Sequence, residues 1–352
     1  MLLKRLCEGA VMAALVATPL TVAACGGGGD GGGASSSAKE GDRGIIKFTF
    51  APDPVWRWLN DQGIRQEMEE KSGIKILDSS TWDEFAIYAG RHADVVSAAS
   101  YEVPDIAKKS GIDSTIFGKY NTSRAVIAVK KDSPYQTLSD LKGKKIVTFT
   151  TVSDLLLWGT LAKKLEGVDL RSGGGDFEVT LADIQNLAPL VAKGDAEACV
   201  CLPDFSIKEF SSGELRPLYD GKSDGQLFAE NVAPGHEGPE SNIFLAPTDW
   251  LESHQKEAQF FLAVWERGIK EWNEHKKEII AAYPQDFAAS NEAQQKWILD
   301  YLNEQQDWFI DTVYLDQKWV DEENRLFPLM KETGFMEEDQ ATPKYQMIQP
   351  GT

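Results

Sequence analysis

The stretch LAPLVAKGDAEACVCL, residues 187–202, decides the fold class of this chain. Its apolar run up to Lys193 is typical of a short helix, and Gly194-Asp195 supplies the turn that ends it. The small apolar residues that follow are typical of a buried strand. Helices that alternate with strands in this way favour an α/β protein, in which helices cover the faces of a sheet.

The same alternation continues toward the N-terminus. Asp53 and Pro54 are typical of a helix start, the first as N-cap and the second at the first helical position, and Gly73 is typical of a helix stop. We therefore predict strands over residues 45–51, 74–77 and 93–97, and helices over residues 53–71, 82–91 and 103–109.

Toward the C-terminus the pattern changes twice. Residues 121–130 form a long extended run, and the glycine- and proline-rich residues 220–241 are typical of a loop. Apolar residues at three- and four-residue steps from Ala258 to Trp272 predict one buried helix face, and we expect a tail from Phe335 onward. Further strands are predicted up to Thr150, at the cysteine pair and over 242–246, and further helices over 138–142, 153–165, 203–210, 293–305 and 319–333.

Composition and charge limit the classes of protein to which this chain can belong. The chain has 352 residues, long enough for two compact lobes. Its 42% hydrophobic and 26% charged residues are ordinary for a globular protein. The net charge of −19 repels phosphate backbones, so we expect no nucleic-acid partner.

The first residues are typical of a targeting segment. Lys4 and Arg5 precede an uncharged apolar run that ends at Ala24. This run is too short to cross a bilayer as a permanent helix. We therefore predict a signal peptide over residues 1–24.

Cys25 follows that segment in the sequence LTVAAC, residues 20–25, which resembles a bacterial lipobox. The resemblance implies that Cys25 is diacylated on sulfur and becomes the new N-terminus. Glycine and serine dominate the residues that follow, so we expect residues 25–43 to form a flexible tether on a lipid anchor. The alternative is an ordinary secretory signal with an unmodified cysteine.

Two cysteines, Cys199 and Cys201, remain in the body of the chain. On a strand they point to the same face, but two thiols alone make no zinc site and no histidine lies near them in sequence. A disulfide across one intervening residue would be strained. We expect both to be small apolar fillers, and a redox role is the alternative.

Four stretches, one of them within residues 187–202, together resemble a known family, the solute-binding proteins of the periplasmic type in the sulfonate, nitrate, taurine and thiamine-pyrimidine group. The resemblance covers about residues 45–335 and implies an α/β fold of the type II periplasmic binding proteins. The four stretches are ADVV at 93–96, LSDLKGKKI at 138–146, LAPLVAKGDAEA at 187–198 and KETGF at 331–335.

The resemblance implies two lobes, each with a doubly wound sheet, joined by two hinge crossings, and a helical C-terminus. We place the crossings near residues 121–130 and 232–246. Lobe one is then residues 44–125 with 240–352, and lobe two is residues 126–239. The cleft between the lobes is expected at the carboxyl ends of the strands, and a solute there would be enclosed by hinge closure.

Candidate solute-binding residues are those just past the predicted strand ends and on the first crossing. Aspartates at several of these helix starts would repel an anion, whereas tryptophans offer flat faces to a ring or a cationic nitrogen. The candidates are Asp53, Trp56, Arg57, Trp82, Ser97, Ala98, Asn121, Arg124, Thr151, Ser153, Asp154, Asp204 and Phe205.

These residue types favour a nitrogen-bearing, aromatic solute such as a pyrimidine-type vitamin precursor, held against Trp56 or Trp82. The alternative is that the aspartates cap helices and the tryptophans pack in the core, in which case an anion held by Arg124 and Ser153 is the next candidate. The sequence leaves the identity and charge of the solute open.

The expected role is that of the extracytoplasmic, lipid-anchored component of an ABC importer. It would be a monomer that delivers its solute to permease and ATPase subunits at the cell membrane. We expect no enzyme, cofactor or metal, because no G-x-S-x-G, H-E-x-x-H or P-loop motif occurs and no histidine adjoins a nucleophile in sequence. The alternatives are a scaffold or sensor lipoprotein, and an enzyme of the thiamine-pyrimidine synthase type.

Overall fold

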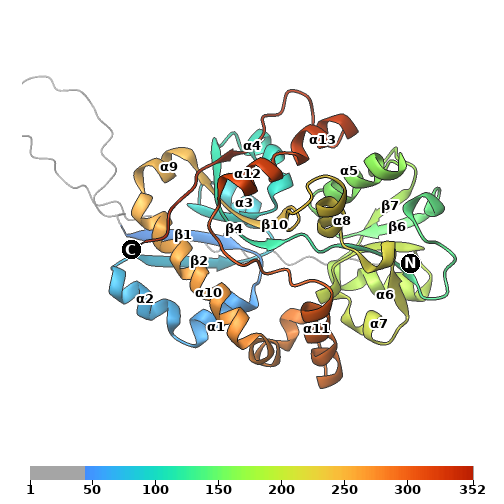
Figure 1. The fold of residues 1–352 in the computed structure, drawn as a ribbon, viewed down its shortest axis with the longest axis horizontal. Helices are drawn as coiled ribbons and strands as arrows, with labels where there is room; N and C mark the ends of the chain where they lie inside the picture. The colour runs from blue at the N-terminus through green and yellow to red at the C-terminus, as the bar shows by residue number, and fades with distance from the viewer. Residues whose placement is uncertain (1–43, 352) are drawn as a thin grey trace, which may run out of the picture. The chain divides into compact units, whose positions relative to one another are not determined.

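A computed structural model describes residues 44–351 of the chain (Figure 1). The predicted signal peptide, Cys25 and the tether lie outside these described residues. The described part contains a six-stranded sheet with the strand order β11-β4-β10-β3-β1-β2 and a five-stranded sheet with the order β7-β6-β8-β5-β9, with helices around both. The predicted α/β class with two sheets is confirmed.

Parallel pairing sets the direction of both sheets. Strand β1 pairs in parallel with β2 and β3, and β6 pairs in parallel with β7 and β8. The carboxyl ends of these parallel strands therefore meet at one edge of each sheet. The six-stranded sheet consists of β1 (Ile45–Phe50), β2 (Lys75–Ser80), β3 (Val95–Ala98), β4 (Ser114–Thr122), β10 (Glu240–Pro247) and β11 (Lys344–Tyr345). The five-stranded sheet consists of β5 (Val126–Lys130), β6 (Lys145–Thr148), β7 (Glu178–Leu181), β8 (Ala198–Cys201) and β9 (Leu215–Pro217).

Helices follow most of the strands and cover the sheets. The α-helices are α1 (Pro54–Asp61), α2 (Ile64–Ser72), α3 (Glu84–Ala89), α4 (Val103–Ser110), α5 (Asp154–Glu166), α6 (Leu187–Lys193), α7 (Ile207–Ser211), α8 (Asp224–Asn231), α9 (Thr248–Ser253), α10 (Gln255–Ala282), α11 (Glu292–Glu304), α12 (Gln317–Glu323) and α13 (Leu326–Thr333). The 3₁₀ turns are η1 (Ser100–Glu102), η2 (Leu138–Leu141), η3 (Ile184–Asn186), η4 (Pro203–Phe205), η5 (Tyr219–Gly221) and η6 (Pro284–Phe287).

Several predicted elements are divided differently in the structure. The helix predicted over 53–71 is two helices, because Gly63 adopts φ of 70° between α1 and α2. The helix predicted over 319–333 is likewise divided into α12 and α13. The extended run 121–130 holds the end of β4 and all of β5, which belong to different sheets.

The segment 220–241 is not a plain loop, because it contains helix α8. Ser223 caps this helix by accepting a hydrogen bond from the backbone N–H of Gln226 at 3.2 Å, and the Gln226 side chain accepts from the Ser223 N–H at 3.1 Å. This reciprocal capping box was visible in the sequence as Ser followed three residues later by Gln. The predicted tail also contains a strand, β11, which pairs with β4.

Two segments, residues 123–125 and 232–239, carry the chain between the sheets, and they are hydrogen-bonded to each other. Ser123 donates its N–H to the carbonyl of Pro239 at 2.8 Å. A Cβ on Gly225, in α8, would lie 2.3 Å from the carbonyl oxygen of Ser123, so only glycine permits this approach. The two crossings are therefore held side by side, while the lobe boundaries and the hinge proposed above stay a prediction.

The C-terminal helix α13 packs against α5 of the five-stranded half. Leu326, Phe327 and Met330 share a buried core with Trp158 of α5. The residues predicted to complete lobe one, 240–352, thus also contribute a helix to the core around α5. A third chain segment, between α12 and α13, accordingly links the two halves.

The core of the six-stranded half is mainly aromatic. Helix α10 buries the face predicted from its periodicity, including Phe261, Trp265 and Trp272. Trp265 packs near the rings of Phe48 and Phe244 on the sheet, with centroids 6.1 and 5.3 Å away. Each such buried aromatic side chain contributes about 2–3 kcal/mol of apolar transfer free energy. This rigid half supports the strand ends that form the site.

Cys199 and Cys201 form a disulfide in strand β8, so the prediction of two free apolar fillers was wrong. The same-face geometry used for that prediction also explains the bond, because it brings the two side chains together with the Cα atoms 5.3 Å apart. Both side chains are fully buried, so the bond lies inside the sheet core.

Candidate solute-binding cleft

A cavity of about 320 Å³ lies where strand ends from the two sheets face each other. Its walls come from the segments that follow β1, β2 and β3 on one side and β6 and β8 on the other. The first crossing and the stretch around Trp308 complete the lining. A concave site at the carboxyl ends of parallel strands is the usual ligand position in open α/β sheets.

The cavity brings together most of the residues predicted from strand ends. Trp56, Arg57 and Thr151 do not line it. Those that line it are Asp53, Trp82, Ser97, Ala98, Asn121, Arg124, Ser153, Asp154, Asp204 and Phe205.

Trp56 is part of the core, which corrects its predicted role against the solute. Its ring stacks on Trp265 at 5.1 Å and its indole N–H donates to Asp78 at 3.0 Å. Helix α1 buries Val55, Trp56 and Leu59, which share its inner face. Trp82 is therefore the tryptophan of the predicted pair that is available to a solute.

Arg57 and Thr151 also lie outside the cavity. Arg57 forms an ion pair with Asp286 at 3.1 Å and lies over the ring of Tyr283. Thr151 is exposed on the segment that follows β6, beside cavity-lining residues. The turn of the backbone at Ser153, which has φ of 56°, directs Ser153 and Asp154 to the cavity instead.

Asp53 both caps a helix and lines the cavity. One carboxyl oxygen accepts hydrogen bonds from the N–H groups of Val55 and Trp56, each at 2.9 Å. Burial, together with the nearby Asp286, raises the pKa of Asp53 to about 7 despite these two bonds. Capping and ligand binding are therefore compatible roles for this residue. Asp83, which precedes α3 in the same way, makes no capping hydrogen bond with its side chain.

Glu84 and Glu102 are cavity residues that the sequence did not single out. Burial raises the pKa of each to about 7, and Glu102 accepts a hydrogen bond from the N–H of Ala99 at 3.1 Å. Burial also raises the pKa of Asp154, to about 6, while Tyr101 donates to it at 3.3 Å. The charges of Asp154 and Glu84 lie close enough to Glu102 to contribute to raising its pKa. A cationic solute would relieve that repulsion.

The lining as a whole is acidic. Its cationic side chains are Lys109 and Arg124, and Arg124 is neutralised by Asp204 through bonds of 3.1 and 2.8 Å. Within residues 44–351, Asn121 Oδ1 and Glu84 Oε2 are buried acceptors without a hydrogen-bond partner. The carboxyl side chains of the lining are Asp53, Asp83, Glu84, Glu102, Asp105, Asp154, Asp204 and Asp286.

Three aromatic rings meet across the cavity. Trp82 follows β2, whereas Phe149 follows β6 and Phe205 lies in η4 after β8. The Trp82 ring meets Phe149 and Phe205 edge-on, with centroids 6.1 and 5.9 Å apart. Trp82 stays 52% exposed, so a flat ligand has access to its face. Phe149 was not among the predicted site residues. In the sequence it is one aromatic residue directly after β6, and nothing there indicates that it lines the cavity.

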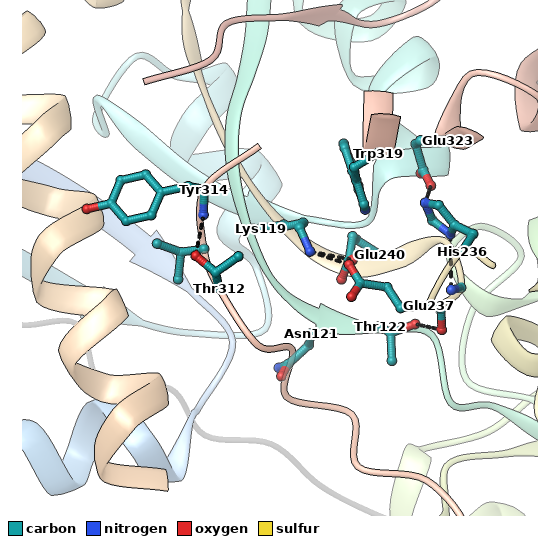
Figure 2. A network of polar contacts seen from close by, with 12 residues as sticks. Lys119, Asn121, Thr122, His236, Glu237, Glu240, Thr312, Tyr314, Trp319 and Glu323 are labelled. Atoms are coloured by element: carbon teal, nitrogen blue, oxygen red, sulfur yellow. Dashed lines mark hydrogen bonds and ion pairs between the residues drawn. The ribbon is translucent and has the colours of Figure 1, made fainter. Parts of the chain in front are cut away.

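A second polar cluster lies outside the cavity, around Lys119 of β4. Figure 2 shows Lys119 directed at Glu237 and Glu240, with His236 and Glu323 beside Trp319. Burial lowers the pKa of His236 to about 4 and raises that of Glu323 to about 8. No group of three or more histidine, cysteine or carboxylate side chains in the described part of the chain is arranged to hold a metal ion.

Among the comparisons with known proteins, the solved structures alone identify the fold. No protein-family model matches the sequence, and no curated protein matches it. Among solved structures, the chain is similar to the periplasmic aliphatic sulphonate binding protein SsuA from Escherichia coli, at 16% identity and a TM-score of 0.66. That match covers 88% of this chain and 94% of SsuA.

Two other similar structures show how varied the carriers of this fold are. The Candida albicans CA3427 product, described as having the generic periplasmic binding protein fold, matches at 14% identity and a TM-score of 0.62, over 88% of this chain and 98% of its own. The desulfurization enzyme DSZB matches at 12% identity and a TM-score of 0.50, over 84% and 95%. The fold is thus that of periplasmic binding proteins, as the sequence resemblance implied.

A helix that spans a membrane must be both long and apolar. Across residues 44–351, no helix combines the length and apolar character required to cross a bilayer.

Proposed function

We propose that this chain is the extracytoplasmic solute-binding component of an ABC importer, and that its solute is a small nitrogen-bearing, ring-containing molecule. The observation that carries the proposal is the cavity between the two sheets, whose lining has more carboxyl than cationic side chains and includes Trp82, Phe149 and Phe205. Amino groups would donate to Glu102, Asp154 and the free Asn121 oxygen. A ring would lie on the face of Trp82.

The sulfonate-type anion, the alternative solute, has support from the fold likeness to SsuA. The lining argues against it, because Asp204 already occupies the guanidinium of Arg124 and the remaining carboxyls repel an anion. A catalytic role has less support, since no histidine or cysteine lines the cavity to activate a serine.

Binding is tested by thermal unfolding of the purified protein. At a hundredfold excess over the dissociation constant, a bound solute stabilises the native state by about 2.7 kcal/mol. We expect this with 4-amino-5-hydroxymethyl-2-methylpyrimidine and not with butane-1-sulfonate. Native mass spectrometry of the same sample detects any solute that copurifies. If neither probe shifts the unfolding temperature and no solute copurifies, the scaffold role is favoured instead.

The anchor is tested by replacing its proposed attachment point. With Cys25→Ser we expect loss of the lipid and release of the protein from the membrane fraction, because one thioether-linked diacyl group supplies the membrane affinity. Cell fractionation with immunoblotting gives the distribution of the wild type and of the variant. A Cys25→Ser protein that still sediments with membranes and is still cleaved after Ala24 would exclude lipid anchoring there.

A further inference from the structure

Arg124 is the cavity's only deeply buried cation among the described residues, and it is already paired. Its Nε and Nη2 atoms donate to the two carboxyl oxygens of Asp204, at 3.1 and 2.8 Å. The side chains of Arg124 and Asp204 are 12% and 6% exposed. The guanidinium also lies over the ring of Trp308 at 4.8 Å, and its Nη1 is 3.5 Å from the Ser241 hydroxyl.

The Asp204 carboxylate makes the contacts that an oxyanion ligand would seek. A guanidinium offers parallel N–H groups that match carboxylate and sulfonate oxygens in a two-bond fork. Asp204 takes that fork from within the chain, and both residues line the cavity. Lys109, the other cation of the lining, is exposed and forms an ion pair with Asp105 at 3.3 Å. An anion that entered would therefore meet no unpaired cation.

The position of Asp204 is fixed by the backbone around it. It lies in the η4 turn, directly after strand β8, where Phe205 donates its N–H to the carbonyl of Leu202 at 3.1 Å. Arg124 is on the first crossing, 80 residues away in sequence. The pair therefore joins the crossing to the five-stranded half and is formed by the fold, not by local sequence.

We propose that Asp204 is the specificity-determining residue of the cleft, an internal carboxylate that occupies the anion position on Arg124 and so excludes sulfonate and carboxylate solutes. This inference rests on the proposed solute-binding function and specifies the charge of its solute. We therefore expect that one neutral substitution at Asp204 would free Arg124 to bind an anion in the cavity.

The experiment compares butane-1-sulfonate binding to the wild type, Asp204→Asn and Asp83→Asn by isothermal titration calorimetry. Asp204→Asn keeps the shape of the side chain but frees charged N–H groups of Arg124, so we expect affinity for the sulfonate to rise about 10- to 100-fold. Asp83→Asn removes the same formal charge from the lining without freeing a cation, and we expect no comparable gain. Adding Arg124→Gln to Asp204→Asn should abolish the gain.

Circular dichroism verifies that each variant is folded, and Asp204→Ala is the substitute if Asp204→Asn is not. A folded Asp204 variant without tighter sulfonate binding overturns the proposal, as does an equal gain in Asp83→Asn. Titration of the same proteins with 4-amino-5-hydroxymethyl-2-methylpyrimidine tests the proposed solute separately. A sulfonate gain confined to Asp204 variants supports the inference even if the pyrimidine fails to bind.

Discussion

Lys119→Met is expected to lower the free energy of unfolding by about 2 kcal/mol at pH 7, less than the loss of a fully buried ion pair, because the Glu237 side chain is 34% exposed. The Lys119 side chain is 5% exposed and pairs with Glu237, while Glu240 lies 3.9 Å from its amine. Methionine preserves the volume but leaves Glu237 without its cation. Urea unfolding followed by circular dichroism measures the loss as a shift of the midpoint.

The sign of the pH dependence follows from the effect of Lys119 on Glu237. In the wild type the amine holds the pKa of Glu237 below its usual value, so this pair stabilises the fold above the unfolded pKa and less as the pH falls. In the variant the amine no longer offsets the effect of burial on the pKa of Glu237, and protonation at low pH relieves the unpaired charge. The difference between wild type and Lys119→Met should therefore be larger at pH 8 than at pH 5.

Two controls separate a buried charge from a general effect of losing lysine. Lys71→Met removes a lysine from an exposed ion pair with Glu67 and should change stability by less than about 0.5 kcal/mol. Lys119→Met combined with Glu237→Gln should recover part of the loss, because no unpaired charge remains at Glu237. Equal midpoints for Lys119→Met and Lys71→Met would show that the buried cluster contributes nothing through its charge.

The sequence predicted the location of the cleft better than its chemistry. Parallel strands with helices between them place their carboxyl ends together, so the segments after β1, β3 and β8 were expected at one site. Asp53, Ser97 and Asp204 line the cavity for this reason. Element order alone brings these segments together, and periodicity and glycine stops reveal that order locally.

The errors arise where contacts between distant segments decide the outcome. Trp56 shares the inner face of α1 with Leu59. Its position on the helix, rather than its closeness to the end of β1, would have predicted that Trp56 lies in the core. Glu84 and Glu102 look in sequence like any surface carboxylate, because their partial burial depends on the tertiary fold. The Arg124–Asp204 pair spans 80 residues, so no local pattern predicts it.

Trp82→Ala is expected to weaken binding of 4-amino-5-hydroxymethyl-2-methylpyrimidine about 30-fold, or about 2 kcal/mol, the usual contribution of an aromatic face to holding a pyrimidine ring. Trp82 is suited to this role because its ring lines the cavity and meets Phe149 and Phe205 from the opposite sheet. Isothermal titration calorimetry measures the affinity of each variant.

Trp82→Ala should weaken binding of the pyrimidine without an equal loss in the stability of the fold. Trp82 is 52% exposed, so its loss leaves no buried cavity and the unfolding midpoint should change by less than about 1 kcal/mol. Trp82→Phe keeps a flat face and should retain most of the affinity. Trp250→Ala removes a tryptophan that stacks on His254 away from the cavity, and the pyrimidine should bind it as it binds the wild type. Wild-type affinity in Trp82→Ala would mean that the ring does not contact the solute, and the acidic lining alone would then account for binding.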